Sequence, residues 1–237
     1  MAKTAQAIDI KKYFYGLMAG TLAVLLLAGP ALAKDKFEAQ ELVDSSRSAF
    51  MDLIDQGDNV TAKALLKEAK GVMIFPSVIK VGLVLGGEGG SGVMMTRAPN
   101  GTWSYPAFYH MASASFGLQI GGQQTRFLLI LMTDEAVNRM LQGEAEIGGD
   151  LSAVIIEDGI DKELTTTTGR KAIYYIAETE AGLFAGASIE GSNIKFRKKT
   201  ARNYYGERVT PQDILVNFKV SEEGAGALRS TVANHSR

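Results

Sequence analysis

The first clear pattern of apolar and polar positions lies between residues 36 and 56, where apolar side chains recur at roughly helical spacing. These apolar positions are Phe37, Leu42, Val43, Phe50, Leu53 and Ile54. Such spacing places them on one side of a helix, so it predicts an amphipathic helix. Gly57-Asp58-Asn59 would end this helix, and Thr61 is positioned to cap a short second helix over residues 62–69.

From about residue 71 to residue 191 the pattern changes to short β-type runs separated by glycine. The predicted strands are 72–75, 79–85, 92–97, 113–120, 126–132, 151–157, 172–177 and 183–189. Glycine accounts for 26 of the 237 residues, above the usual level of about 7%. Many of these glycines lie within apolar runs, which indicates bends, bulges and close backbone packing. We therefore expect a strongly curved antiparallel sheet or a small barrel.

Further helices are indicated in the middle and at the end of the chain. Thr133 is a cap for a helix over residues 134–141, whose first turn carries acids that the helix dipole favours. Thr210 followed by Pro211 predicts the start of another helix, reaching residue 218. Ser221 is a candidate cap for a last, glycine-interrupted helix. The expected fold class is α+β, with N-terminal, middle and C-terminal helices around the sheet.

The N-terminal segment has the three parts of a secretory signal peptide. Three lysines lie within residues 3–12, an uncharged apolar stretch follows at 16–28, and Ala-Leu-Ala at 31–33 is typical of a cleavage site. The apolar stretch is shorter than the roughly 20 residues of a membrane-spanning helix. We therefore predict a signal peptide at 1–33 and export to the periplasm or beyond, with a retained membrane anchor as the alternative. No Pro/Ser-rich linker divides the remainder, which predicts a single domain over residues 34–237.

Charge and cysteine content exclude several classes of function. Without residues 1–33 the chain carries 22 basic and 25 acidic residues, a net charge of −3. A nucleic-acid-binding protein would be expected to carry a strong basic excess, so this class is disfavoured. The absence of cysteine excludes disulfides and thiolate zinc sites.

Residues 87–92 (GEGGSG) match the glycine spacing of a dinucleotide-binding loop. That site needs a helix directly after the glycines and an acid about 20 residues later. Residues 93–97 instead read as a strand, and residues 107–112 contain no acid. We interpret the cluster as a glycine-rich turn or bend between two strands, expect no cofactor there, and expect Gly87→Ala and Gly89→Ala to perturb folding.

No arrangement of side chains predicts a catalytic or metal site. His110 and His235 are the two histidines, and the carboxylate pairs Glu178/Glu180 and Glu157/Asp158 fit a solvated strand face and a turn. A hydrolase that uses His110 or a carboxylate pair stays open as one alternative. The prediction is a protein without catalytic residues.

The most directional charge feature lies near the end of the β region. It comprises five cations followed by two aromatic residues, Lys195, Arg197, Lys198, Lys199, Arg202, Tyr204 and Tyr205. Such a cluster can adsorb to anionic lipid headgroups, at about 1 kcal/mol per basic residue near the surface. The alternative is a solvated loop. We take these seven residues as the candidate lipid-binding site, whereas the acidic polar face of the helix over residues 36–56 favours packing on the protein core.

Several segments together resemble the SYLF domain family, a lipid-binding and actin-regulator-like family. They are residues 69–76 (AKGVMIFP), 86–92, 101–107, 117–121, 181–191 and 203–206 (NYYG). Their order and spacing cover almost the whole chain after residue 33. The resemblance implies a lipid-binding module rather than an enzyme, because eukaryotic members bind phosphoinositides and bacterial members look like exported lipid-binding proteins.

Two departures limit what the resemblance implies. Fungal members bind and bundle actin, but the signal peptide would remove this protein from cytosolic actin, and no SH3 or FYVE module accompanies the domain. The expected partner is therefore an anionic phospholipid or membrane surface, with actin disfavoured. The alternative is an envelope structural or assembly protein that binds a protein partner.

The N-terminal pattern predicts that the exported protein begins at Lys34. Intact-mass measurement or N-terminal sequencing of protein from the native host checks this. Recovery of Met1 to Ala33 on protein in the membrane fraction would contradict cleavage and favour the anchored form.

Overall fold

The computed structural model describes residues 34–55, 60–82, 85–116, 121–156, 172–179, 182–183 and 189–237. The helices are an N-terminal helix (residues 34–55), α2 (Val60–Glu68), α3 (Asp134–Leu141), α4 (Lys198–Tyr205), α5 (Pro211–Leu215) and α6 (Gly226–His235), the last preceded by the 3-10 turn η2 (Glu223–Ala225). The strands are β1 (Gly71–Gly82), β2 (Leu85–Thr96), β3 (Ala107–Phe116), β4 (Gly121–Leu131), β5 (Glu144–Glu146), β6 (Ala153–Ile155), β7 (Ile173–Thr179), β8 (Gly182–Leu183) and β9 (Asn193–Phe196).

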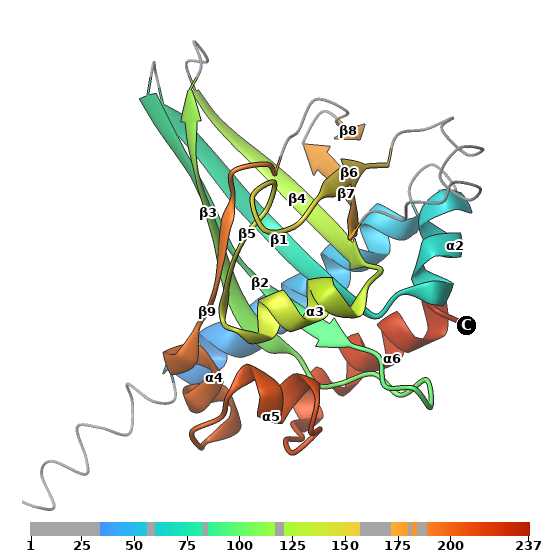
Figure 1. The fold of residues 1–237 in the computed structure, drawn as a ribbon. Helices are drawn as coiled ribbons and strands as arrows, with labels where there is room; N and C mark the ends of the chain where they lie inside the picture. Colours follow the sequence, from blue (N-terminus) through green and yellow to red (C-terminus); the bar gives the residue numbers. More distant parts are fainter. Residues whose placement is uncertain are drawn as a thin grey trace, which may run out of the picture.

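The strands form one curled sheet in the order β5-β9-β3-β2-β1-β4-β7-β6, with β8 paired to β7. All pairs are antiparallel except β6 with β7, which is parallel. The sheet curls into an open half-barrel (Figure 1). The expected α+β class with a strongly curved sheet is confirmed, and the sheet is open rather than a closed barrel.

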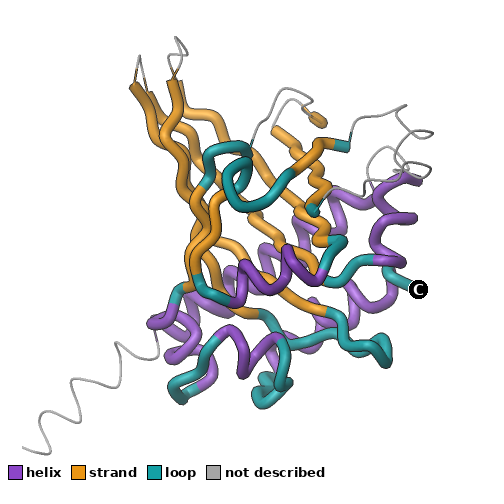
Figure 2. Tube along the Cα trace, in the orientation of Figure 1, coloured by secondary structure: helices purple, strands orange, loops and turns teal. Residues whose placement is uncertain are grey.

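Both faces of the sheet are covered by helices. In β3, the Tyr109 hydroxyl donates to the Met140 carbonyl of α3 (2.8 Å), whereas the neighbouring Phe108 packs edge-on against Tyr204 of α4 with ring centroids 5.0 Å apart. Because successive strand residues point to opposite faces, α3 and α4 lie on opposite sides of the sheet. Figure 2 shows that the helices gather toward one end, while β1 to β4 extend beyond them.

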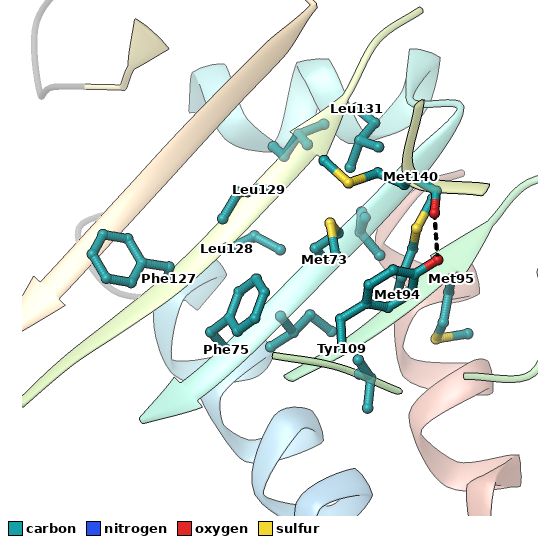
Figure 3. Close-up of a cluster of buried hydrophobic side chains, with 14 of the residues drawn as sticks. Met73, Phe75, Met94, Met95, Tyr109, Phe127, Leu128, Leu129, Leu131 and Met140 are labelled. Carbon is teal, nitrogen blue, oxygen red and sulfur yellow. Dashed lines mark hydrogen bonds between the residues drawn. The ribbon is translucent and has the colours of Figure 1, made fainter. Parts of the chain in front are cut away.

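The apolar core on the α3 side is built from the central strands. Figure 3 shows Met73 and Phe75 of β1 beside Leu129 of β4, with the Tyr109–Met140 hydrogen bond next to them. All of these side chains are buried. The helix α3 is held in place at its start by Thr133, whose hydroxyl accepts from the Ala136 amide at 3.1 Å, as its sequence predicts.

The glycine cluster 87–92 lies inside β2 and not between two strands, so its interpretation as a turn or bend between two strands was wrong. Strand β1 is one long strand whose register shifts between Ile74 and Ser77, where a bulge forms. At Gly90, an added Cβ would lie 2.8 Å from Val78 Cγ2 and closer still to the Ser77 carbonyl oxygen. At Gly92 it would meet the Ile74 carbonyl and the Phe75 ring. The glycines let the bulge of β1 press onto β2. A dinucleotide site requires a helix directly after the glycines, but here the strand β2 continues through them.

The positions in this cluster that matter for packing also differ from the expected ones. A Cβ at Gly87 would have no neighbour within 4 Å, and one at Gly89 would make ordinary contacts of 3.5 Å or more. The expectation that these two positions control folding is therefore corrected to Gly90 and Gly92.

Other element boundaries were only partly foreseen. Thr210 caps α5 through a capping box with Asp213, as predicted, but the helix ends at Leu215. Thr61 lies inside α2 and does not precede it, and Glu222, not Ser221, is the N-cap of η2. Strand β3 starts at residue 107, six residues before the prediction, and β5, β9 and α4 were not predicted at all. Parts of the strands expected at 79–85, 113–120, 151–157 and 183–189 lie outside the described residues.

We predict that Gly90→Ala and Gly92→Ala each lower the free energy of unfolding by about 2 kcal/mol or more, because the new methyl group must displace backbone of β1. Gly87→Ala is the matched control and is expected to change it by less than about 0.5 kcal/mol. Urea denaturation followed by circular dichroism measures all three. Equal destabilisation by all three would show that the cluster does not act through this close approach.

Candidate functional site

The basic segment chosen from sequence is the end of β9 followed by α4. Arg197 is the N-cap of α4, and Gly206 ends the helix with a left-handed backbone (φ 76°) that favours glycine. Ala201 and Tyr204 face inward and are buried. The segment is thus an amphipathic helix seated on the sheet and not a solvated loop.

Three of the five cations lie together on the outer side of α4. Lys198 and Arg202 are one helical turn apart and Lys199 is adjacent, and all three are exposed. Lys199 Nζ lies 3.1 Å from Asp35 Oδ2 of the N-terminal helix, yet its side chain is 75% exposed. Within the described ranges, Lys198 and Arg202 have no ion pair or side-chain hydrogen bond. We call Lys198, Lys199 and Arg202 the cationic face.

The other two cations have different environments. Lys195 on β9 is exposed but donates a hydrogen bond to Glu144 of β5 at 3.0 Å, and this hydrogen bond lowers the pKa of the Glu144 carboxyl. Arg197 is half-buried and donates to the Ser91 hydroxyl of β2 at 2.9 Å. The five cations therefore do not form one exposed surface.

The two tyrosines hold α4 in place instead of pointing outward. The Tyr204 hydroxyl donates to Gln40 Oε1 of the N-terminal helix at 2.8 Å, and the Tyr205 hydroxyl donates to the Pro106 carbonyl at 2.7 Å. Burial raises the pKa of both phenols. Since Tyr204 is fully buried and Tyr205 is half-buried with its hydroxyl bonded to the backbone, neither is available for insertion into a lipid layer.

A groove of about 310 Å³ separates α4 from the start of the N-terminal helix. Its walls and floor come from Asp35, Glu38, Ala39, Leu42, Ser91, Arg197, Lys199, Thr200 and Asn203. Most of these side chains are polar, unlike those of an apolar lipid-uptake cavity. Sequence reasoning missed the acidic wall, because Asp35 lies more than 160 positions before the α4 residues that it contacts.

The other residues considered from the sequence are the two histidines and the carboxylate pairs. His110 is exposed on β3 opposite Ser91, and its pKa is lowered by partial burial and then by the nearby charge of Arg197. Glu178 is buried and accepts from Arg126 at 3.3 Å. His235 contacts the Thr231 carbonyl in its own helix. Glu157, Asp158 and Glu180 lie outside the described residues.

Metal-binding clusters and membrane-spanning helices are both absent from the described residues. No group of three His, Asp or Glu side chains in this part of the chain is arranged to hold a metal ion. No helix in it combines the length and apolarity needed to cross a membrane.

Comparison with known proteins shows that α4 lies within the part of the chain that matches a family model. The model of the Ysc84 family, described as Las17-binding protein actin regulator, matches residues 112–235, just over half of the chain. Protein YSC84 of Saccharomyces cerevisiae is 37% identical over 161 residues, and LAS seventeen-binding protein 3 of the same species is 36% identical over 161 residues. The human SH3 domain-containing YSC84-like protein 1 is 33% identical over 159 residues.

These similarities cover 67% of this chain in each case, but only 34%, 35% and 46% of the three relatives. The chain thus spans about a third to just under half the length of the curated relatives it matches. The name LAS seventeen-binding protein 3 describes binding, and the description of the family adds actin regulation.

Proposed function

We propose that the chain acts by binding and not by catalysis, because it belongs to the Ysc84 family of Las17-binding protein actin regulators. This membership confirms the SYLF resemblance. The proposed partner of the chain is an anionic phospholipid surface, and the contact is the cationic face of α4. The observation that carries the proposal is the exposure of Lys198 and Arg202 on one side of a helix whose opposite side is fixed to the sheet.

Electrostatics support this choice of surface. Lys198 and Arg202 contribute about 1 kcal/mol each near an anionic membrane, which favours reversible adsorption, whereas the charge of Lys199 is offset by Asp35. Without residues 1–33 the chain carries a net charge of −3, so an anionic surface repels most of the protein. Approach with the cationic face of α4 toward the lipid limits this repulsion.

The position of the N-terminal helix is compatible with an exported, membrane-associated protein in both forms considered from the sequence, the cleaved form and the form with a retained anchor. Asp35 lies against α4 through Lys199 and Asn203. The chain therefore enters the domain beside the cationic face. A retained N-terminal anchor would hold that face close to the membrane, and cleavage at residue 33 would leave it free to bind reversibly. Actin regulation is not included in the proposal, since export would separate the protein from cytosolic actin.

We predict that Lys198→Glu combined with Arg202→Glu lowers partitioning onto phosphatidylglycerol-containing vesicles by about tenfold or more at low salt, because two attractive charges become repulsive. Binding by the unaltered protein should rise with anionic lipid content. It should fall with salt as the Debye length shrinks from about 10 Å at 0.1 M to about 3 Å at 1 M. Vesicle co-sedimentation measures each effect.

The matched control is Lys67→Glu with Lys70→Glu near α2, which gives the same change in net charge on exposed positions. It is expected to alter partitioning by less than about twofold. Melting temperatures of both double variants should stay close to that of the unaltered protein, since exposed charges contribute little to folding. Salt-insensitive binding that survives the α4 reversal would contradict the proposal. Absence of binding to any vesicle would favour a protein partner, the kind of partner after which the yeast relative is named.

A further inference from the structure

The groove between the N-terminal helix and α4 has walls of opposite charge. Asp35 and Glu38 lie on the N-terminal helix, and Arg197 and Lys199 belong to the α4 side. The four formal charges sum to zero. At about 310 Å³ the groove is at the lower end of the range of small-molecule sites, roughly 300–1,000 Å³.

Two of these four charges already neutralise each other. Asp35 accepts from Asn203 Nδ2 at 2.7 Å, and Lys199 Nζ lies 3.1 Å from the same carboxylate. The Asp35–Lys199 pair and the Asn203–Asp35 hydrogen bond join the two walls at one point. They also leave Glu38 and Arg197 as the charges available to a ligand.

Arg197 and Glu38 have weak partners within the described part of the chain. Arg197 is a half-buried residue, and its guanidinium donates to a neutral hydroxyl, that of Ser91. Glu38 has Lys34 at 3.9 Å, and the two side chains are 59% and 76% exposed. A pair at this distance and exposure contributes little. The groove thus presents one cation and one anion on opposite walls, each without a close counter-charge.

The start of α4 adds to the cationic wall. Arg197 occupies the N-cap position, and its side chain makes no capping hydrogen bond. The first amides of a helix have no partner inside the helix and carry a partial positive charge that attracts anions. Thr200, in the first turn, also lines the groove. A phosphate beside Arg197 would therefore meet a guanidinium fork and the positive end of a helix together.

We propose that this groove binds a phosphoethanolamine group, with the phosphate on Arg197 and the start of α4, and the primary ammonium on Glu38. A phosphodiester with a primary ammonium has zero net charge, which matches the sum of the charges in the groove. A bare phosphate would leave Glu38 facing an anion. A choline group would lack the N–H donors that a carboxylate accepts.

The phosphoethanolamine group can come from a lipid headgroup or from a soluble phosphodiester. The lipid source rests on the proposed function, because Lys199 belongs to both the groove and the cationic face, and a membrane held by that face would present headgroups to the groove. Binding of the soluble group does not depend on any membrane, so the two proposals can fail separately.

Titration of the full chain with sn-glycero-3-phosphoethanolamine, followed by NMR chemical shifts or calorimetry, tests the site. We expect saturable binding, weakened about fivefold or more by Glu38→Gln and by Arg197→Lys, which keeps the charge but loses the guanidinium fork. Glu41→Gln is the matched control for Glu38, because it removes the same charge from an exposed position on the same helix. It should leave the affinity unchanged, as should Lys67→Gln.

Glycerol 3-phosphate and glycerophosphocholine serve as comparison probes and should bind at least several-fold more weakly. Absence of saturable binding would overturn the proposal. So would equal binding of glycerol 3-phosphate together with insensitivity to Glu38→Gln, since both would indicate a simple anion site.

Vesicles distinguish the two sources of the ligand. At constant phosphatidylglycerol content, replacing phosphatidylcholine by phosphatidylethanolamine should raise partitioning of the unaltered protein and not of Glu38→Gln. No increase, with soluble binding intact, would overturn the lipid source and leave the soluble phosphodiester as the ligand. Salt-sensitive vesicle binding without any probe binding would overturn the groove alone.

Discussion

Between Ile74 and Val78 the strand β1 bulges and presses onto β2 at Gly90 and Gly92, where the absence of side chains lets the two backbones approach. Bulges increase the local twist and bend of a strand, so this contact bends the sheet and contributes to its curl. The curl gives the molecule two differently shaped faces. One face packs on α3 through Tyr109, and the other receives α4 through Phe108.

The position of α4 follows from that geometry. Tyr204 and Tyr205 bond to the N-terminal helix and to the backbone before β3, and both rings pack near Phe108. With its inner side fixed in this way, the helix presents Lys198, Lys199 and Arg202 to the outside. The same seating brings α4 next to Asp35 and creates the groove of mixed charge. The apolar contacts thus determine where the charges lie, and the charges determine what the surface can bind.

Sequence patterns predicted those features that depend on neighbours in the chain. The caps Thr133 and Thr210 act on amides three residues away, so their signals are local. Features set by distant contacts were missed or misassigned. Gly90 and Gly92 resemble turn residues unless the bulge of β1 is known, and β9 is only four residues long. The helix α4 was missed because cations dominate its composition and only one side of it is apolar.

The candidate site shows the same division. The sequence shows where the basic segment lies in the chain, but it could not tell which side chains point outward. The spacing of Lys198 and Arg202 suits one helix face, yet this spacing has meaning only once the segment is known to be helical. Aromatic residues beside cations suit either membrane insertion or core packing, and the contacts of Tyr204 decide for the core. Glu38 and Asp35 had no signal linking them to α4.

The central claim, that the protein contacts an anionic membrane through α4, is tested most directly by measuring which side of the molecule faces the lipid. The chain contains no cysteine, so a single label can be placed at will. Nitroxide labels at Lys199→Cys on α4 and, separately, at Lys67→Cys on α2 can be compared for collision with a water-soluble paramagnetic reagent. On addition of phosphatidylglycerol vesicles at low salt, the account predicts that the α4 label becomes shielded and that the α2 label stays accessible. Shielding of the α2 label, with the α4 label remaining accessible on bound protein, would contradict it.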